Sequence, residues 1–188
     1  ALIVEGYFDV ISLHQAGIKY VVAPLGTALT EQHILMLKRY TLNIITVFDA
    51  DSSGEKAMIR SLIPFLSCGV SPRMILLPKG HDPDSFVRQY GAQAFIQLVD
   101  EALPLIDFVA EQIIKKHQIT TPQGKIQASD ELIPLLENMR NEVERDFYTQ
   151  KIASRLNIKE AYLLKKIEKA AERGYGQTDK TAFPSAGA

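Results

Sequence analysis

The chain has 188 residues, of which 46% are hydrophobic and 23% are charged, a composition typical of a globular protein with one core domain and a smaller appendage. Its 21 basic and 22 acidic side chains give a formal net charge of −1, which excludes a global electrostatic attraction to nucleic acid or to a membrane. The single cysteine excludes an internal disulfide, and the sequence contains neither a signal peptide nor an apolar run of about 18 residues, so we expect a cytoplasmic protein.

Four short apolar runs predict strands, at residues 2–4, 20–23, 43–48 and 73–77. Between them, the stretches "YFDVISLHQAG", "LTEQHILMLKRY" and "GEKAMIRSLIPFLSCG" have the spacing of amphipathic helices. The first and third end in a glycine suited to a helix C-terminus, and Thr30 suits the N-cap of the second. Strands that alternate with helices over short connections predict an α/β fold, with a mainly parallel sheet flanked by helices.

Helical patterns replace strands in the second half of the chain. Two helices are predicted at about 84–90, with Pro83 at the beginning, and at about 92–99. After Pro104 the patterns are all helical, interrupted by the turn-rich "TTPQGK", and Pro134 predicts a helix start or a kink. We therefore expect three parts: the α/β domain at 1–100, a small all-α helical bundle at 101–173 and a flexible tail or linker at 174–188.

Acidic side chains follow three of the predicted strands, where each strand ends. They are Glu5 after the first strand, Asp49 and Asp51 after the third, and Asp82 and Asp84 after the fourth. Open α/β sheets bind ligands beyond the carboxyl ends of their strands, so the five carboxylates could share one cleft. Clustered carboxylates raise one another's pKa and call for a cation. Their oxygens suit Mg²⁺ or Mn²⁺, and such a site would support metal-assisted phosphoryl transfer.

Each acid also has an ordinary structural interpretation. Asp51 could cap the helix that begins near Gly54, and Asp82 and Asp84 flank a proline and suit a turn or an N-cap. Asp9 suits the first turn of a helix, where its charge complements the helix dipole, and this role is favoured over a metal contact. The recurrence of acids at three strand ends favours the metal site for the set as a whole.

Four motifs together resemble a known family. "VEGYFDV", "PLGTALT", "VFDADSSGEKA" and "LPKGHDPDSF", in this order and at these separations, resemble the Toprim domain of bacterial DnaG-type primases. The first and third motifs alone indicate only the wider Toprim group, which includes topoisomerases and certain nucleases, and the other two narrow it to primases. The helical stretch to about residue 170 is similar to the subdomain that follows Toprim in those enzymes.

The resemblance implies a nucleotidyltransferase that polymerises ribonucleoside triphosphates on a single-stranded DNA template into short RNA primers for replication. It implies that five acids form a cluster that binds Mg²⁺ or Mn²⁺: Glu5, Asp49, Asp51, Asp82 and Asp84. Of these, Glu5, Asp49 and Asp51 would also be catalytic. Gly26 and Thr27 would belong to the cofactor-binding site, where Gly26, like Gly6, would permit a turn near the cleft and Thr27 would approach a phosphate. An ordinary turn role is favoured for these three residues.

The family also implies parts that this sequence lacks. DnaG-type primases carry an N-terminal zinc-binding domain, a basic subdomain before Toprim and a C-terminal helicase-binding domain. The sequence has no Cys/His cluster and few cations near the acids, such as Lys79 and Arg88. We therefore expect a fragment that holds no zinc and cannot make primers unaided. We also expect it to reach the replicative helicase only through an absent domain and to have no membrane contact.

Two other function classes stay open. A Toprim-type nuclease or topoisomerase module would use the same acids to cleave DNA, and metal-dependent nicking of a plasmid would reveal it. A non-catalytic nucleotide-binding or interaction module would keep the fold without a working site, and metal affinity would separate it from an enzyme. The stretch "SRLNIKEAYLLKKI" predicts a helix, a turn and a helix, for which a packing role is favoured over DNA binding.

Overall fold

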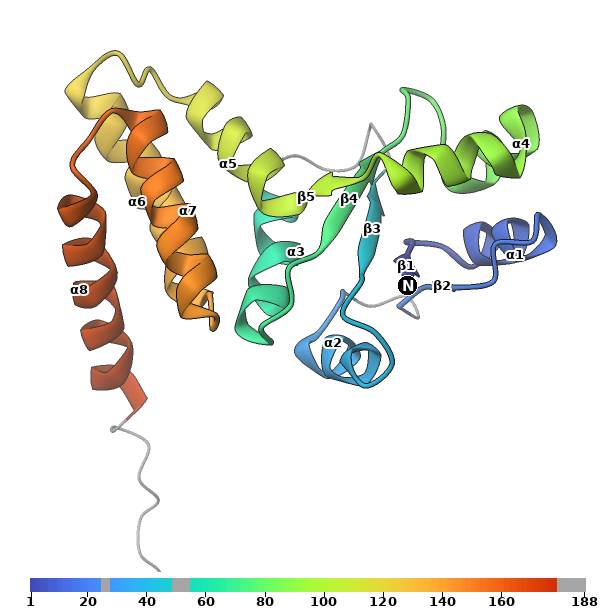
Figure 1. The fold of residues 1–188 in the computed structure, drawn as a ribbon, viewed down its shortest axis with the longest axis horizontal. Helices are drawn as coiled ribbons and strands as arrows, with labels where there is room; N and C mark the ends of the chain where they lie inside the picture. The colour runs from blue at the N-terminus through green and yellow to red at the C-terminus, as the bar shows by residue number, and fades with distance from the viewer. Residues whose placement is uncertain (25–27, 49–54, 179–188) are drawn as a thin grey trace, which may run out of the picture. The chain divides into compact units, whose positions relative to one another are not determined.

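A computed structural model describes residues 1–24, 28–48 and 55–178, without the side chains of 55–59 and 171–178. The chain forms two compact units, Ala1–Lys115 and Lys116–Ala188. The elements of both are shown in Figure 1. Over the described ranges, no helix is both long and apolar enough to cross a bilayer.

Within the described residues, the first unit contains a five-stranded sheet with the strand order β2-β1-β3-β4-β5. The strands are β1 (Leu2–Ile3), β2 (Val21–Val22), β3 (Ile45–Phe48), β4 (Arg73–Leu76) and β5 (Leu103–Pro104). The first four run parallel, and β5 pairs antiparallel with β4. The four predicted strands are therefore confirmed. The sequence missed β5 because a two-residue strand that includes a proline has no periodic pattern.

Helices cover both faces of this sheet, which confirms the predicted α/β class (Figure 1). The helices of the unit are α1 (Tyr7–Gln15), α2 (Glu31–Lys38), α3 (Glu55–Ser67), α4 (Pro83–Asp100) and α5 (Leu105–Lys116), of which the last residue, Lys116, belongs to the second unit. Leu2 of β1 shares a buried cluster with Leu13 of α1 and Phe95 of α4. Its neighbour Ile3 belongs to a second cluster, which includes residues of α2 and α3. Successive side chains of a strand point to opposite faces, so α1 and α4 cover one face and α2 and α3 the other.

The connections change direction between β1 and β3. Helix α1 links β1 to β2 on one side, whereas α2 carries the chain from β2 across to β3 on the other side of β1. A switch point of this kind leaves a crevice at the carboxyl ends of the two strands, where open α/β sheets bind their ligands. Glu5 follows β1 in the chain, and the segment that begins with Asp49 follows β3.

The predicted ends of several helices are confirmed. Gly17 and Gly69 follow α1 and α3 with φ of 92° and 66°, the left-handed conformation of a glycine that ends a helix. The Thr30 hydroxyl accepts a backbone N–H from the first turn of α2, and Pro83 is the first residue of α4. The two helices predicted in this region form α4, with a break at Gly91, where φ is 84° and ψ is 167°.

The second unit contains α6 (Pro122–Asn138), α7 (Glu142–Leu156) and α8 (Glu160–Thr178), as the predicted all-α segment requires. Buried leucines and isoleucines of the three helices form its interior, among them Leu132, Leu136, Ile152, Leu156 and Leu163. The predicted helix, turn and helix are confirmed as α7 and α8. Asn157 makes the turn with a left-handed φ of 49°.

The predicted helix ends in this unit differ from the structure at three places. Residues 117–121 separate α5 from α6, so only the first two residues of "TTPQGK" lie between helices. The Thr121 hydroxyl accepts the Gly124 N–H at 3.0 Å and caps α6, and Pro122 is the first residue of that helix. Pro134 lies inside α6, so of its two predicted roles the helix start is excluded and the kink stays a prediction. In addition, α8 continues to Thr178, past residue 174, where the tail is predicted to begin.

Candidate functional site

The predicted site residues divide into two groups. Glu5, Asp82 and Asp84 lie in described segments. Four others lie outside the described residues: Gly26, Thr27, Asp49 and Asp51. The described part of the candidate site is thus the loop from β1 to α1 and the first turn of α4, together with the side chains that connect them.

The loop after β1 brings Glu5, Gly6 and Asp9 to the carboxyl end of that strand. Glu5 is exposed. Gly6 is the N-cap of α1, and its backbone N–H donates to Asp9 Oδ2 over 3.1 Å. A Cβ on Gly6 would lie only 2.9 Å from that oxygen, and the φ of Gly6 is −113°, which any residue can adopt. The glycine therefore leaves room for the Asp9 carboxylate, which is a different role from the turn that the sequence suggests.

Asp84, in the first turn of α4, is held by side chains of α1. The backbone N–H of Asp84 donates to Asp9 Oδ1 at 3.3 Å. The Ser12 hydroxyl, on a side chain that is 7% exposed, donates to Asp84 Oδ1. One turn further along α4, Arg88 Nε lies 2.7 Å from the same oxygen. Two segments more than 70 residues apart in the sequence are thus joined at Asp84, through its side chain and its backbone N–H.

Asp82 is the N-cap of α4. Its Oδ1 accepts the Ser85 N–H at 2.7 Å, and its own N–H donates to the Ser85 hydroxyl at 3.0 Å. The hydrogen bonds from Ser85 lower the pKa of Asp82. The capping interpretation of Asp82 is therefore confirmed, and its role as a metal ligand stays a prediction.

Asp9 has the opposite electrostatic environment. Partial burial raises its pKa, and the nearby carboxylates of Asp82 and Asp84 raise it further. The hydrogen bonds that Asp9 accepts from the backbone of Gly6 and Asp84 act against this rise. Asp9 also lies in the first turn of α1, as predicted. The carboxylates of Asp82 and Asp84 thus add to the rise at Asp9, whereas the mutual rise that the sequence predicts for the five strand-end acids stays a prediction.

These residues agree in chemistry with a divalent metal site, although they do not complete one. Carboxylate oxygens are the donors that Mg²⁺ and Mn²⁺ prefer. Outer hydrogen-bond partners commonly orient a ligating carboxylate, as Ser12 and Arg88 orient Asp84. In the part of the chain that the structure describes, no three His, Cys, Asp or Glu side chains gather closely enough to hold an ion. A full ligand set would need Asp49 and Asp51.

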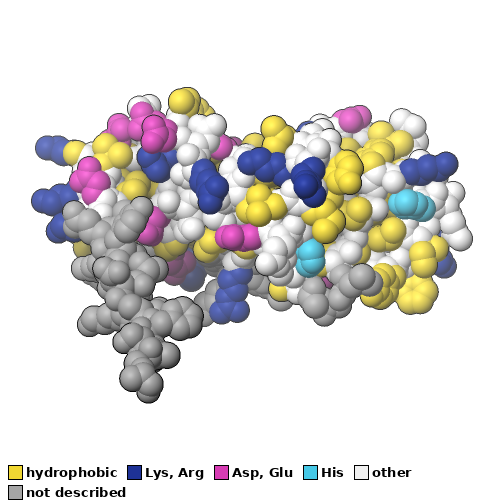
Figure 2. Space-filling view, turned by 90° about the horizontal axis from the view of Figure 1, so that it is seen from below, with side chains coloured by type: hydrophobic (Ala, Val, Ile, Leu, Met, Phe, Trp, Pro, Cys, Tyr) yellow, Lys and Arg dark blue, Asp and Glu magenta, His cyan; other side chains and the backbone are white. Residues whose placement is uncertain are grey.

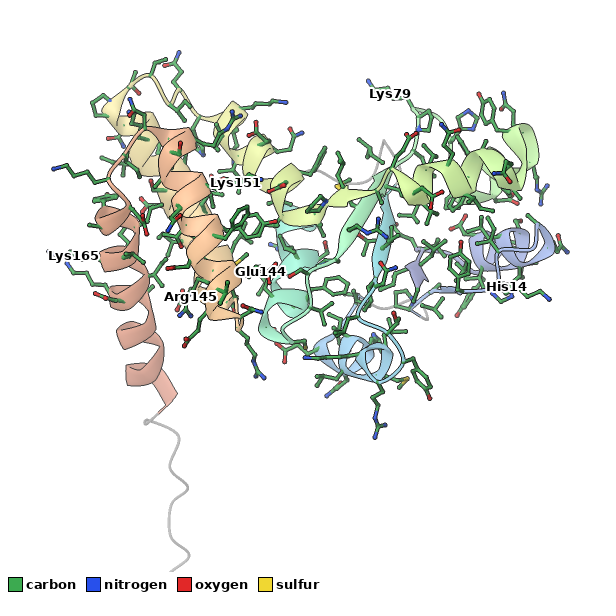
Figure 3. The ribbon with its side chains drawn as sticks, viewed as in Figure 1. His14, Lys79, Glu144, Arg145, Lys151 and Lys165 are labelled. Carbon is green, nitrogen blue, oxygen red and sulfur yellow. The ribbon has the colours of Figure 1, made fainter. Side chains whose placement is uncertain are left out.

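Cations near the candidate site are few. Lys79 is exposed on the loop between β4 and α4 and projects outward from it (Figure 3). The side chain of Arg88 is 71% exposed and pairs with Asp84. On the face shown in Figure 2, lysine and arginine side chains are scattered among hydrophobic ones, without forming a broad basic surface.

None of the sequence motifs singles out Ser12, and Arg88 is predicted only to be one of the few cations near the acids. A signal for Ser12 was available, because Asp9 and Ser12 are three residues apart and share one face of a helix. That face also carries Leu13, a residue of the buried cluster between α1 and the sheet. A polar pair beside such a residue indicates a polar partner on the element that packs against the helix.

Two family descriptions match the chain. Residues 2–87 match "Toprim-like", and residues 106–161 match "DnaB-helicase binding domain of primase". The DNA primase of Escherichia coli K12 is 37% identical over 177 residues, which is 92% of this chain and 30% of that protein. The DNA primase of Clostridium acetobutylicum is 38% identical over 159 residues, which is 85% of this chain and 26% of that protein. The chain thus spans less than a third of these relatives.

Solved structures give the same result. A DNA primase domain from Pseudomonas aeruginosa matches with a TM-score of 0.82 and 34% identity, over 89% of this chain and 53% of the other. A DnaG primase catalytic domain bound to single-stranded DNA matches with a TM-score of 0.79 and 35% identity, over 86% and 52%. These likenesses confirm the predicted fold class and the predicted resemblance. The helicase-binding match falls on residues of this chain, whereas the sequence assigned helicase binding to an absent domain.

Proposed function

The chain is related to the DnaG-type DNA primases through its Toprim and helical segments, and on this premise we propose that it carries the metal-dependent nucleotidyl-transfer site of a primase. Its substrates would be ribonucleoside triphosphates and a single-stranded DNA template. The observation that carries the proposal is the junction at which Asp9 and Ser12 of α1 hold Asp84 of α4 beside the carboxyl end of β1. This junction lies near the switch point of the sheet, where such folds bind ligands.

The proposed metal ligands are the five acids of the strand ends: Glu5, Asp49, Asp51, Asp82 and Asp84. A bound Mg²⁺ or Mn²⁺ would stabilise negative charge on the phosphate oxygens during transfer. Asp82 and Asp84 each use Oδ1 for a protein contact, Asp82 to the Ser85 N–H and Asp84 to Ser12 and Arg88. Each carboxylate would offer its other oxygen to an ion. Glu5 and the two aspartates after β3 would act at the reacting phosphate, and Gly26 and Thr27 would lie near the nucleotide.

Calorimetric titration with Mn²⁺ tests this proposal. We expect saturable binding to the 188-residue chain and its loss in the double variant Asp49→Asn, Asp51→Asn, because two carboxylate ligands would be removed without a change in side-chain size. The matched control is Asp130→Asn, Glu131→Gln, which removes two adjacent acids of α6 and should bind Mn²⁺ normally. Equal binding by all three proteins would show that the strand-end acids are not metal ligands.

The match over residues 106–161 supports a second proposal, that the helical unit contacts the replicative helicase. Its α7 carries two exposed apolar side chains one turn apart, Val143 and Phe147, which are 81% and 57% exposed. Figure 3 shows Lys151 further along the same helix. Such side chains suit a protein contact because burying them removes apolar surface from water.

Binding of the chain to a purified bacterial replicative helicase, measured by surface plasmon resonance, tests the second proposal. We expect Val143→Asp, Phe147→Asp to weaken binding at least tenfold. The control Tyr40→Asp changes a side chain of the first unit that is 85% exposed, and it should bind normally. The proposal fails if the unaltered chain does not bind, or if the α7 variant and the control bind equally.

A further inference from the structure

We propose that Ser12 is a positioning residue for Asp84, fixing one oxygen of that carboxylate so that the other is presented to a divalent metal ion. The inference rests on the proposed function, in which Asp84 is a metal ligand. It concerns a side chain that none of the sequence motifs singles out as functional. Its basis is the contact between α1 and α4, the two helices that lie side by side on one face of the sheet (Figures 1 and 3).

The direction of the Ser12 hydrogen bond is unusual for a helical serine. Serine and threonine in helices commonly donate to the carbonyl four residues earlier in their own helix. Ser129 does so in α6, to Lys125 O at 2.7 Å, and Thr149 does so in α7, to Arg145 O at 2.7 Å. The Ser12 hydroxyl donates instead to a carboxylate of another helix. A buried hydroxyl that meets a charged acceptor makes one of the stronger kinds of hydrogen bond.

The two side chains that contact the Asp84 carboxylate within the described residues meet the same oxygen. Ser12 and Arg88 each meet Oδ1, so rotation of the carboxylate about its last bond would break two contacts at once. The Arg88 side chain is 71% exposed, and an exposed pair of residues four apart on a helix contributes little by itself. The buried Ser12 contact therefore sets the orientation of the carboxylate, and Arg88 reinforces it.

Asp9 fixes the backbone beneath this carboxylate. Its two oxygens accept the N–H of Gly6 and the N–H of Asp84, and so tie the loop after β1 to the first turn of α4. Backbone and side chain of Asp84 are thus both held from α1. Outer partners that hold a ligand in this way typically change metal affinity by 10- to 100-fold when they are removed.

The test is calorimetric titration of the 188-residue chain with Mn²⁺, with the melting temperature of each variant measured beside it. We expect Ser12→Ala to raise the Mn²⁺ dissociation constant about tenfold, at the lower end of outer-partner effects. The matched control is Ser129→Ala, which removes a fully buried serine hydroxyl from the other unit and should leave Mn²⁺ affinity unchanged.

The double variant Ser12→Ala, Asp84→Asn separates positioning from a merely structural role. If Ser12 acts through Asp84, its removal has no further effect on Mn²⁺ affinity once Asp84 is changed. A tenfold loss that persists in the Asp84→Asn background would overturn the inference. So would a normal affinity of Ser12→Ala beside a weakened Asp84→Asn, a result that leaves the metal site itself standing. If Asp84→Asn binds Mn²⁺ normally, both the Ser12 role and the assignment of Asp84 as a ligand are overturned.

Discussion

The acidic side chains of the two units have contrasting surroundings. In the helical unit each of two adjacent acids of α6 meets a cation. Asp130 pairs with Lys166 of α8, and both oxygens of Glu131 lie 2.9 Å from Lys116 Nζ. His117 Nε2 lies 3.1 Å from Glu131 as well. These pairs connect elements of one unit and complete their own charge balance.

In the sheet unit the acids lie near one another. Asp82 and Asp84 both raise the pKa of Asp9, after the larger effect of burial. Within the described residues, the cation Arg88 pairs with Asp84, one of these acids. Glu131 shows the reverse, because the hydrogen bonds from Lys116 and His117 outweigh its own burial and lower its pKa. The pKa of Glu131 is thus lowered by its cation partners, whereas the pKa of Asp9 is raised by its own burial and further by neighbouring acids, and this difference distinguishes the acids of the two units.

The largest expected effect is on the free energy of unfolding of the sheet unit. It tests whether the two units unfold independently of each other. Phe95 is fully buried in the sheet unit, with its ring centroid 6.0 Å from that of Phe86. Phe95→Ala should lower the free energy of unfolding of this unit by about 3–5 kcal/mol, because it leaves a cavity. Hydrogen exchange should show lost protection in α1 and α4 and normal protection in α6 and α7. Loss of protection in all four helices would contradict the division.

A loss of stability is also expected in the helical unit when a single methyl group is added at Gly124. A Cβ added at Gly124 of α6 would lie 2.0 Å from the backbone oxygen of Gln118, a group that cannot move aside. Gly124→Ala should therefore lower the free energy of unfolding by about 1–3 kcal/mol, the usual cost of overpacking. Urea unfolding followed by circular dichroism measures the effect. The exposed variant Ile126→Ala in the same helix is the control, and equal stability of the two variants would contradict the predicted clash.

The fold was largely predictable because its signals are local. Alternation along the strands places Ile45 and Val47 in one buried cluster, and glycines such as Gly17 mark the helix ends. The errors arose where one pattern permits two structures. Thr121 followed by Pro122 can be a turn, and the same pair is a helix N-cap and first residue, which is the structure observed.

The candidate site was predictable only in part. Acids at the ends of parallel strands meet because of the sheet, so the placement of Glu5 follows from its position after β1. The cap at Asp82 was one of two foreseen interpretations, since an aspartate before a proline suits a helix start. The contact of Ser12 with Asp84 depends on how α1 packs against α4, and no local pattern encodes a packing between residues so far apart in the sequence.

Gly6→Ala should have a smaller effect than Gly124→Ala, because the atom in the way belongs to a movable side chain. The new Cβ would displace Asp9 Oδ2 from the Gly6 N–H, and the loss of this hydrogen bond should cost about 0.5–1.5 kcal/mol. In an Asp9→Ala background the oxygen is absent, so Gly6→Ala should then cost almost nothing. Thermal melts of the four proteins of this cycle measure the coupling. Additive losses would mean that Gly6 serves another purpose.

The smallest expected effect concerns the sign of the pH dependence, which should differ between the two kinds of acid. The folded chain raises the pKa of Asp9 above its ordinary value of 3.8, so it binds that proton more tightly than the unfolded chain does. The contribution of Asp9 to stability is therefore fully present below pH 3.8 and is lost as the pH rises through the raised pKa. Metal-free wild type should gain stability relative to Asp9→Asn when the pH falls through this window.

Glu131 should show the opposite slope. Its pKa is lowered below the ordinary value of 4.5, so its contribution is present above pH 4.5 and is lost as the pH falls through the lowered value. The side chains of Glu131 and Lys116 are 34% and 40% exposed, so Glu131→Gln should cost only about 0.2–1 kcal/mol at pH 7, and less in acid. Urea unfolding in EDTA from pH 3.5 to pH 7 measures both variants against wild type. Slopes of the same sign would mean that burial and the neighbouring carboxylates do not raise the pKa of Asp9 in the folded chain, and the contrast between the acids of the two units would be lost.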